Sequence, residues 1–418
     1  MIRAILKNLR HMVLWLLLLT SVLQATEITT GFLLGPKYDS QAFYIRRGSG
    51  DEWRKTYSGS DYRRQAQGKL MNLRLAQGLY QDEWLSEKPF DPDANTNALI
   101  AALDFYKRHG VLMVNVSLQG GQPGYDGQIY GLNRKNGYKY GRGQGTHASA
   151  FLPNGDLKSE WLSRLERLLQ AAAQRGMVVN LLYFYQGQDE LFESTEAIHA
   201  AARNVTDWLI EKRFRNVVID VANEWDLRGD RWDLGSYIPE NVLKLIEDIR
   251  DRFQKKSAGY ALPISVSSDG RMNYPVSFSS VVDFVLIHGN NRTPQQKSER
   301  VAEFKNADRP VLMNEDDNGR ASTTANLAKE LASCDIFFER AAGWGYMPWV
   351  QAQRFPFRYL PSESAEIRDE MPESERDMAY FHAVLDHIAS LTLNKSPHPK
   401  SRRPVGSTTV RQRSLSCE

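Results

Sequence analysis

Two glutamates of this 418-residue chain each follow an asparagine at the end of an apolar run. Asn223 and Glu224 come directly after VVIDVA, and Asn314 and Glu315 come directly after PVLM. Apolar runs of this kind are typical of strands that are covered on both faces of a parallel sheet. Polar groups at the carboxyl ends of such strands lie where α/β folds bind ligands and do chemistry. Two carboxyl groups that flank one bond are the minimal requirement for glycoside hydrolysis.

The elements that would hold these residues alternate between strand and helix. Amphipathic segments, such as 98–110 and 160–176, separate most of the apolar runs and are followed by glycine, as in αβ turns. The runs with strand composition are 69–78, 110–118, 176–185, 215–224, 262–268, 281–289, 309–316 and 342–350. Eight such units predict an α/β protein with a (β/α)8 TIM barrel. The alternative, a doubly wound sheet, would be expected to carry a glycine-rich phosphate loop after its first strand, and LAQGLYQDEW has none.

In this barrel Glu224 would end the fourth strand and Glu315 the seventh. These two strands lie nearly opposite each other, so both side chains are expected to point into one cleft. Hydrolysis then needs one carboxyl group that holds a proton and one that stays ionised.

The strand ends ANEWD and PVLMNED resemble the pattern of the clan A glycoside hydrolases, nearest to the cellulase-like family 5. The resemblance covers about residues 69–390 as an order of short motifs. It implies that Glu224 is the acid/base, that Glu315 is the nucleophile, and that the anomeric configuration is retained. It also implies that Asn223 hydrogen-bonds the 2-hydroxyl of the sugar at the cleavage point.

The resemblance assigns further substrate-binding residues at other strand ends. His288, which ends the sixth strand, matches the clan's histidine near the active site, and Trp349, after the eighth, matches its aromatic platform under the sugar. Arg74, on the first strand, matches the arginine that steadies the nucleophile by a charge-assisted bond. Tyr183 and Tyr185 end the third strand and are expected to face the cleft, where they could bind substrate or pack in the top layer of the barrel.

Two features depart from the clan pattern. Asn290 stands where the clan has a tyrosine that touches the nucleophile, and Asp316 and Asp317 follow Glu315 where an aromatic residue is commoner. A second carboxylate could raise the pKa of Glu315 and weaken it as a nucleophile, or could be turned away from it. These departures leave open a barrel that binds carbohydrate without cleaving it. A transglycosylase would use the same residues as the hydrolase.

A long segment, 119–150, follows the second predicted strand and contains many glycines and four tyrosines. A βα loop of this kind lies on the catalytic face of a barrel. Its aromatic rings could stack on sugars, or they could pack only against one another.

The chain is expected to have four parts. They are a signal peptide over 1–25, a β-hairpin extension over 26–68, the barrel over 69–394 and a disordered basic tail over 395–418. The first part places basic residues before an apolar segment that is short for a membrane span, with an uncleaved anchor as the alternative. A cleaved signal predicts a secreted or periplasmic protein without stable membrane insertion. The sequence does not indicate an oligomeric state.

The net charge of +3 comes from the two ends, which carry +3 and +5 and leave the part between them at −5. An acidic body with basic ends does not have the charge distribution of a nucleic-acid-binding protein. Four aspartates, Asp226, Asp230, Asp316 and Asp317, are plausible cation ligands, but no histidine pair or calcium-type loop accompanies them. The two cysteines form no metal or disulfide pattern. We therefore expect a carbohydrate substrate, no metal and no cofactor.

Overall fold

The structure of the chain is a computed structural model. It describes residues 31–33, 44–46, 69–80, 91–120, 149–186, 188–227, 232, 237–256, 261–304, 309–319, 321–353, 356–361 and 366–393. The predicted signal peptide, the four tyrosines of the long loop and the predicted tail lie outside these residues, as does Asp230.

Eight strand positions follow the order that the sequence predicts. They are β3 (Asn72–Arg74), β4 (Met113–Ser117), β5 (Val178–Phe184), β6 (Val217–Ala222), β7 (Ile264–Ser265) together with β8 (Ser267–Ser268), β9 (Val285–His288), β10 (Val311–Glu315) and β11 (Gly345–Tyr346). Each lies within one of the predicted runs, and all the pairings between them are parallel.

These strands form a closed ring. β7 and β8 are two halves of one stretch, of which the first pairs with β6 and the second with β9. The segments on either side of β11 join β10 by single bonds: the Ala342 amide donates to the Val311 carbonyl at 2.7 Å, the Met313 amide donates to the Gly343 carbonyl at 3.3 Å, and the Met347 amide donates to the Asp316 carbonyl at 2.9 Å. β11 in turn pairs with β3. The predicted (β/α)8 barrel is therefore confirmed.

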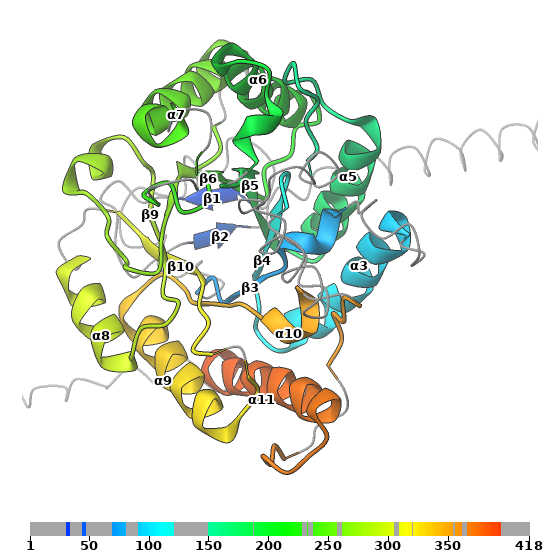
Figure 1. The fold of residues 1–418 in the computed structure, drawn as a ribbon, viewed down its shortest axis with the longest axis vertical. Coiled ribbons are helices and arrows are strands. Elements are labelled where there is room, and N and C mark those ends of the chain that lie inside the picture. Colours follow the sequence, from blue (N-terminus) through cyan, green and yellow to red (C-terminus); the bar gives the residue numbers. More distant parts are fainter. Residues whose placement is uncertain are drawn as a thin grey trace, which may run out of the picture.

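Helices form an outer ring around the strands (Figure 1). They are α3 (Pro92–Arg108), α5 (Ser159–Gln174), α6 (Thr195–Glu211), α7 (Tyr237–Lys256), α8 (Pro294–Glu303), α9 (Thr324–Arg340), the short α10 (Trp349–Ala352) and α11 (Glu373–Leu393). The helices begin at local sequence signals. At α3 the side chain of Asp91 accepts the backbone N–H groups of Asp93 and Ala94, and Pro92 occupies the first helical position. The described residues also include three 3-10 turns: η2 (Ala76–Leu79), η4 (Asp189–Leu191) and η5 (Val276–Ser280), the last of which takes the place of a helix between β8 and β9.

The strands separate two apolar clusters. The larger one fills the space between strands and helices. The smaller one fills one end of the barrel interior and consists of Leu70, Leu112, Met113, Val178, Val218, Phe284, Leu286, Leu312 and Ala342. Further along the strands, toward their carboxyl ends, the alternate positions carry the buried polar residues Asn72, Asn115, Asn180, Asp220 and Asn314. The barrel interior thus changes from apolar to polar in the direction of the predicted site.

Ahead of the barrel, β1 (Gly31–Leu33) pairs antiparallel with β2 (Tyr44–Arg46), as the predicted hairpin requires. Among the described residues, no helix combines the length and the apolarity that a bilayer span demands.

Candidate active site

A β-bulge aims Glu315 into the barrel. Met313 pairs with Ile287 and Glu315 pairs with His288, so Asn314 is an extra residue in β10. Strict alternation would point Glu315 in the direction of Met313, which packs in the apolar cluster toward the helices. The extra residue reverses that direction, as bulges beside active sites do.

A left-handed residue turns the chain at the end of β6. Glu224 has a φ of +49°, which is uncommon for a residue other than glycine. The turn is held by the Trp225 amide, which donates to the Ser267 carbonyl at 3.2 Å, and by the Leu227 amide, which donates to the Glu224 carbonyl at 3.0 Å. Unusual backbone of this kind persists where surrounding contacts over-determine it, and it gathers at functional sites.

Side-chain hydrogen bonds link these two glutamates. Arg74 forms an ion pair with Glu315 through Nε, and its Nη2 donates to Asn223 Oδ1 at 2.6 Å. Asn223 Nδ2 donates to Gln186 Oε1 at 2.8 Å, and Gln186 Nε2 donates to Glu224 Oε2 at 2.9 Å. A continuous chain of contacts therefore runs from one carboxylate to the other.

His288 closes this chain into a ring. Its Nδ1 lies 3.2 Å from Glu224 Oε1 and 3.6 Å from Glu315 Oε2. We call the six residues, from Arg74 through Asn223, Gln186, Glu224 and His288 to Glu315, the polar ring. One oxygen of each carboxylate and one nitrogen of the histidine all lie within 4.8 Å of one another. Such a trio can hold a cation, but the buried guanidinium of Arg74 already supplies positive charge to Glu315.

The surroundings favour an ionised Glu315. Burial by itself would raise the pKa of this carboxyl group, but the charges of Arg74 and His288 and the hydrogen bond from Asn290 outweigh burial and lower it. Burial likewise acts to lower the pKa of His288, and here the two glutamates prevail and raise it. The ring thus pairs an ionised carboxylate with an imidazole that favours its proton.

Asn290 replaces the tyrosine that the clan pattern would place there. Its Nδ2 donates to Glu315 Oε1 at 2.6 Å. A donor to the carboxylate is therefore present at this position, although it is an amide and not a hydroxyl group.

Asp316 does not face Glu315. It is fully buried and contacts Lys297 of α8, whose Nζ lies 2.6 Å from Asp316 Oδ1, while Trp344 Nε1 donates to its Oδ2 at 2.8 Å. Because the bulge points Glu315 inward, the next residue points outward to the helices. Asp317 Oδ1 accepts the Gly319 amide at 2.9 Å, and its side chain reaches the edge of the pocket.

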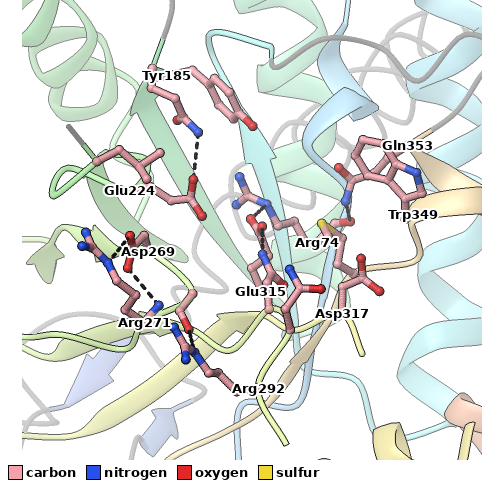
Figure 2. Close-up of a pocket in the computed structure, with 16 residues that line it drawn as sticks. Arg74, Tyr185, Glu224, Asp269, Arg271, Arg292, Glu315, Asp317, Trp349 and Gln353 are labelled. Carbon is pink, nitrogen blue, oxygen red and sulfur yellow. Dashed lines mark hydrogen bonds and ion pairs between the residues drawn. The ribbon is translucent and has the colours of Figure 1, made fainter. Parts of the chain in front are cut away.

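A cavity of about 380 Å³ opens above the polar ring (Figure 2). Its lining consists of Arg74, Tyr185, Gln186, Glu224, Leu227, Asp269, Gly270, Arg271, Asn290, Asn291, Arg292, Glu315, Asp317, Met347, Trp349 and Gln353. Glu315 and Arg74 lie near its middle, with Glu224 and Trp349 on opposite sides. Its volume is in the range of small-ligand sites.

Most of the predicted site residues meet in this pocket. Arg74, Tyr185, Glu224, Glu315 and Trp349 all line it, and Trp349 does so from the first residue of α10. Asn223 and His288, which are at most 1% exposed, are not among the described lining residues and lie within the polar ring. Both ends of the Asn223 amide bond to ring members, and its contact with a sugar hydroxyl stays a prediction.

The prediction that Tyr183 faces the cleft is wrong. Its ring is fully buried in the cluster between strands and helices, with its hydroxyl 3.4 Å from Thr206 Oγ1 of α6. Tyr183 and Tyr185 would share a direction if the strand continued, but β5 ends at Phe184, so Tyr185 lies outside its regular alternation.

Several lining residues were not singled out from the sequence. Asp269 and Arg271, which follow the fifth strand position, form an ion pair at 2.7 Å, and the Asp269 amide bonds to Asp226 Oδ1 at 2.8 Å. Asp226 is thereby engaged in a loop contact. Gln353 Nε2 donates to the Arg74 carbonyl at 3.0 Å. The signal for the first pair is the polar DGR directly after the predicted strand 262–268, whereas Gln353 has no such signal.

No family model matches this sequence, and no curated protein matches it either. The structure is similar to a family 5 glycoside hydrolase from Bacteroides vulgatus, with a TM-score of 0.51 and 11% identity over 85% of this chain and 68% of that one. A putative glycoside hydrolase from the same organism has a TM-score of 0.48 at 12% identity over 76% of this chain. An endo-β-1,4-mannanase from Thermotoga petrophila has a TM-score of 0.48 at 10% identity over 80%.

This chain spans 55% of the length of the putative glycoside hydrolase. At these identities the likeness concerns the fold. The chain therefore has the (β/α)8-barrel fold that is found in family 5 of the clan A glycoside hydrolases.

Proposed function

We propose that this protein is a retaining glycoside hydrolase that acts on an oligo- or polysaccharide by double displacement. The observation that carries the proposal is the pairing of Glu224 and Glu315 in one pocket, with carboxylate oxygens within 4.8 Å of each other. Retaining enzymes hold their two carboxyl groups about 5–5.5 Å apart, whereas inverting enzymes hold them roughly 6.5–9.5 Å apart to admit a water molecule.

In this mechanism Glu315 is the nucleophile. Its lowered pKa, with Arg74 and His288 beside it, supports an anion that attacks the anomeric carbon. Glu224 donates its proton to the leaving oxygen as the glycosidic bond breaks, which leaves a covalent glycosyl ester on Glu315. Glu224 then takes a proton from a water molecule that attacks the same carbon, and Glu315 leaves as the carboxylate.

The pocket offers aromatic surface for the sugar. Trp349 and Tyr185 line it from different strand ends, and apolar ring faces of this kind stack on the apolar faces of pyranoses. Polar side chains, among them Asn290, Asp317 and Gln353, provide donors and acceptors for hydroxyl groups. We further propose export from the cytoplasm on the basis of the N-terminal segment, which N-terminal sequencing of the mature protein would test.

The test is a screen of aryl glycosides and oligosaccharides with the wild type, Glu224→Gln and Glu315→Gln. Glu315→Gln is expected to lose on the order of 10⁴–10⁶-fold in kcat. Glu224→Gln is expected to lose about 10²–10⁴-fold on poor leaving groups and much less on activated aryl glycosides, which need no acid. Glu339→Gln, at an exposed glutamate of α9, is the matched control.

The stereochemistry is read separately by proton NMR of the first product. Retention supports the proposal, and inversion contradicts the nucleophile assignment. A wild type that binds oligosaccharides as tightly as Glu315→Gln and turns none over would be a carbohydrate-binding barrel. Transfer products that predominate over hydrolysis at high acceptor concentration would instead show a transglycosylase.

A further inference from the structure

Three potential metal ligands converge on the outside of the barrel, where α3 meets α11. His109 is the residue that follows the last turn of α3, and His382 and Asp386 lie four residues apart on α11. Residues at this spacing lie on the same face of a helix. The three side chains belong to elements at the two ends of the barrel sequence and take no part in the polar ring.

The distances between their ligand atoms match a small coordination sphere. His109 Nε2 and His382 Nε2 each lie 3.5 Å from Asp386 Oδ1, and all three atoms lie within 4.8 Å of one another. Zinc bonds of about 2.0–2.2 Å to nitrogen and oxygen place neighbouring tetrahedral ligands about 3.3 Å apart. The two nitrogen–oxygen distances therefore already approximate the edges of a zinc tetrahedron.

The tautomer of His109 suits a metal ligand. Its Nδ1 lies 2.8 Å from the Phe105 carbonyl, an acceptor, so Nδ1 is the donor there and Nε2 is the nitrogen left to face a metal ion. A second hydrogen bond of this type is characteristic of metal-binding histidines, whose orientation it sets. Phe105 also packs against His109, with ring centroids 4.2 Å apart, and meets His382 edge-on at 5.7 Å between centroids, which holds both imidazoles in place.

The cluster is half-buried and accessible. The histidine side chains are 16% and 12% exposed, whereas Asp386 is 52% exposed. An ion can therefore enter from solvent and keep a water molecule as its fourth ligand. The apolar wall that Phe105 provides lowers the local dielectric, which strengthens the attraction between a divalent cation and the carboxylate.

We propose that His109, His382 and Asp386 form a Zn²⁺ site that joins the C-terminal helix to the first helix of the barrel. The ion replaces the weak His–Asp contacts by three coordinate bonds between α3 and α11. Its role is structural, because the site lies on the outer helices and not in the pocket. The proposal is independent of the proposed glycosidase activity.

The test uses the full-length protein, stripped with a chelator and then titrated with ZnCl₂ by calorimetry, with Co²⁺ absorption as a second readout. We expect one Zn²⁺ per chain, a raised Tm and the visible d–d bands of a tetrahedral site. His109→Asn, His382→Asn and Asp386→Asn should each weaken binding by at least ~30-fold, since loss of one ligand of three removes a full coordinate bond. The zinc-dependent rise in Tm should shrink with it.

The matched control is His387→Asn. His387 sits on the same helix and pairs with Asp335 at 2.8 Å, but no third ligand meets that pair among the described residues. The His387→Asn variant should bind zinc as tightly as the wild type. If a histidine variant fails to fold, Asp386→Asn still tests the site, because the Asp386 side chain is exposed and its replacement should disturb the fold little.

Three results would overturn the proposal. The first is the absence of binding at micromolar Zn²⁺. The second is binding that survives Asp386→Asn but disappears in Glu224→Gln, which would place the ion in the polar ring. The third is a Tm that is lower in the variants than in the wild type by the same amount with and without zinc, which would show that the three side chains contribute only ion pairs. Failure here leaves the glycosidase proposal untouched, because kcat is measured separately on the stripped and the loaded protein.

Discussion

At the scale of single residues, the character of the pocket depends on how Glu315 is held. Three groups, Arg74, His288 and Asn290, contact its carboxylate and together overcome the effect of burial on its pKa. Hydrogen bonds to the charged form of an acid favour that form. Asn290 is the neutral member of this set, so its removal tests the hydrogen bond without removing a charge.

Asn290→Ala should move the acidic limb of the kcat/KM profile to higher pH. The amide bonds to ionised Glu315, and without it the pKa of that carboxyl group rises from its lowered value. A shift of about one pH unit corresponds to about 1.4 kcal/mol and to a tenfold loss of activity on the acidic side of the limb. The profile is measured between pH 3 and 7 with a fast aryl glycoside.

Asn291→Gly is the control for this shift. Asn291 also lines the pocket, its φ of +60° suits glycine, and it makes no side-chain contact with Glu315. An unmoved acidic limb in Asn290→Ala would show that Asn290 does not support the ionised form.

At the scale of elements, backbone irregularities aim the two carboxylates. The bulge at Asn314 and the left-handed Glu224 each interrupt a regular strand at its carboxyl end. Gly343, just before β11, meets a different requirement, because it lets the chain ahead of β11 approach the chain ahead of β3. A Cβ there would lie 2.1 Å from the Leu70 carbonyl oxygen.

Gly343→Ala should destabilise the closure of the barrel between β10, β11 and β3. Backbone atoms cannot move aside as a side chain can, so we expect a loss of about 3 kcal/mol or more in the free energy of unfolding. Gly78→Ala is the matched control, because its Cβ would clash with the side-chain atom Leu99 Cδ2 at 2.4 Å and with no backbone atom, so the substitution should cost about 1 kcal/mol. Urea unfolding followed by tryptophan fluorescence compares the two, and equal losses would contradict the argument.

The sequence predicts the strands and their polar ends because the change from apolar to polar residues is local. Asn223–Glu224 and Asn314–Glu315 could be found in this way. Which way a side chain points at such an end depends on where regular pairing stops. Tyr183 faces the helices together with Val179 and Leu181, because alternate residues of β5 share a face, whereas Tyr185 lies beyond the end of the strand. His109 and His382 could not be paired from the sequence, because only the closed ring of helices brings them together.

At the scale of the whole molecule, the barrel interior holds a carboxyl group beneath the polar ring. Asp220 is fully buried, accepts the Ser267 amide at 2.9 Å through Oδ1 and has no partner for Oδ2 among the described residues. Burial raises its pKa to about 6, although the charge of His288 and the bonds from Ser267 oppose this.

The raised pKa makes the stability depend on pH. Between the ordinary value of 3.8 and about 6, the folded state holds a proton that the unfolded state has lost. The free energy of unfolding therefore falls as the pH rises through this window and stays lower above it. Asp220→Asn removes the cost of ionisation, so it should stabilise the protein by on the order of 2–3 kcal/mol at pH 7.5 and by little at pH 4.

Thermal unfolding of Asp220→Asn and the wild type at both pH values measures this difference. Asp251→Asn, at an exposed surface ion pair with Lys255, should change stability little at either pH. A gain at pH 4 that equals the gain at pH 7.5 would show that ionisation of Asp220 is not the cause.

The apolar cluster at the amino end of the barrel limits the routes by which molecules can reach the two glutamates. Leu70, Val178, Leu286 and Leu312 are fully buried in this cluster, so among the described residues solvent approaches Glu224 from the pocket. A sugar ester on Glu315 would cover part of that approach, and the space vacated by the leaving group would admit the next molecule. Water and an acceptor alcohol would have to enter through the same opening of the pocket, so the shape of that opening would decide between hydrolysis and sugar transfer.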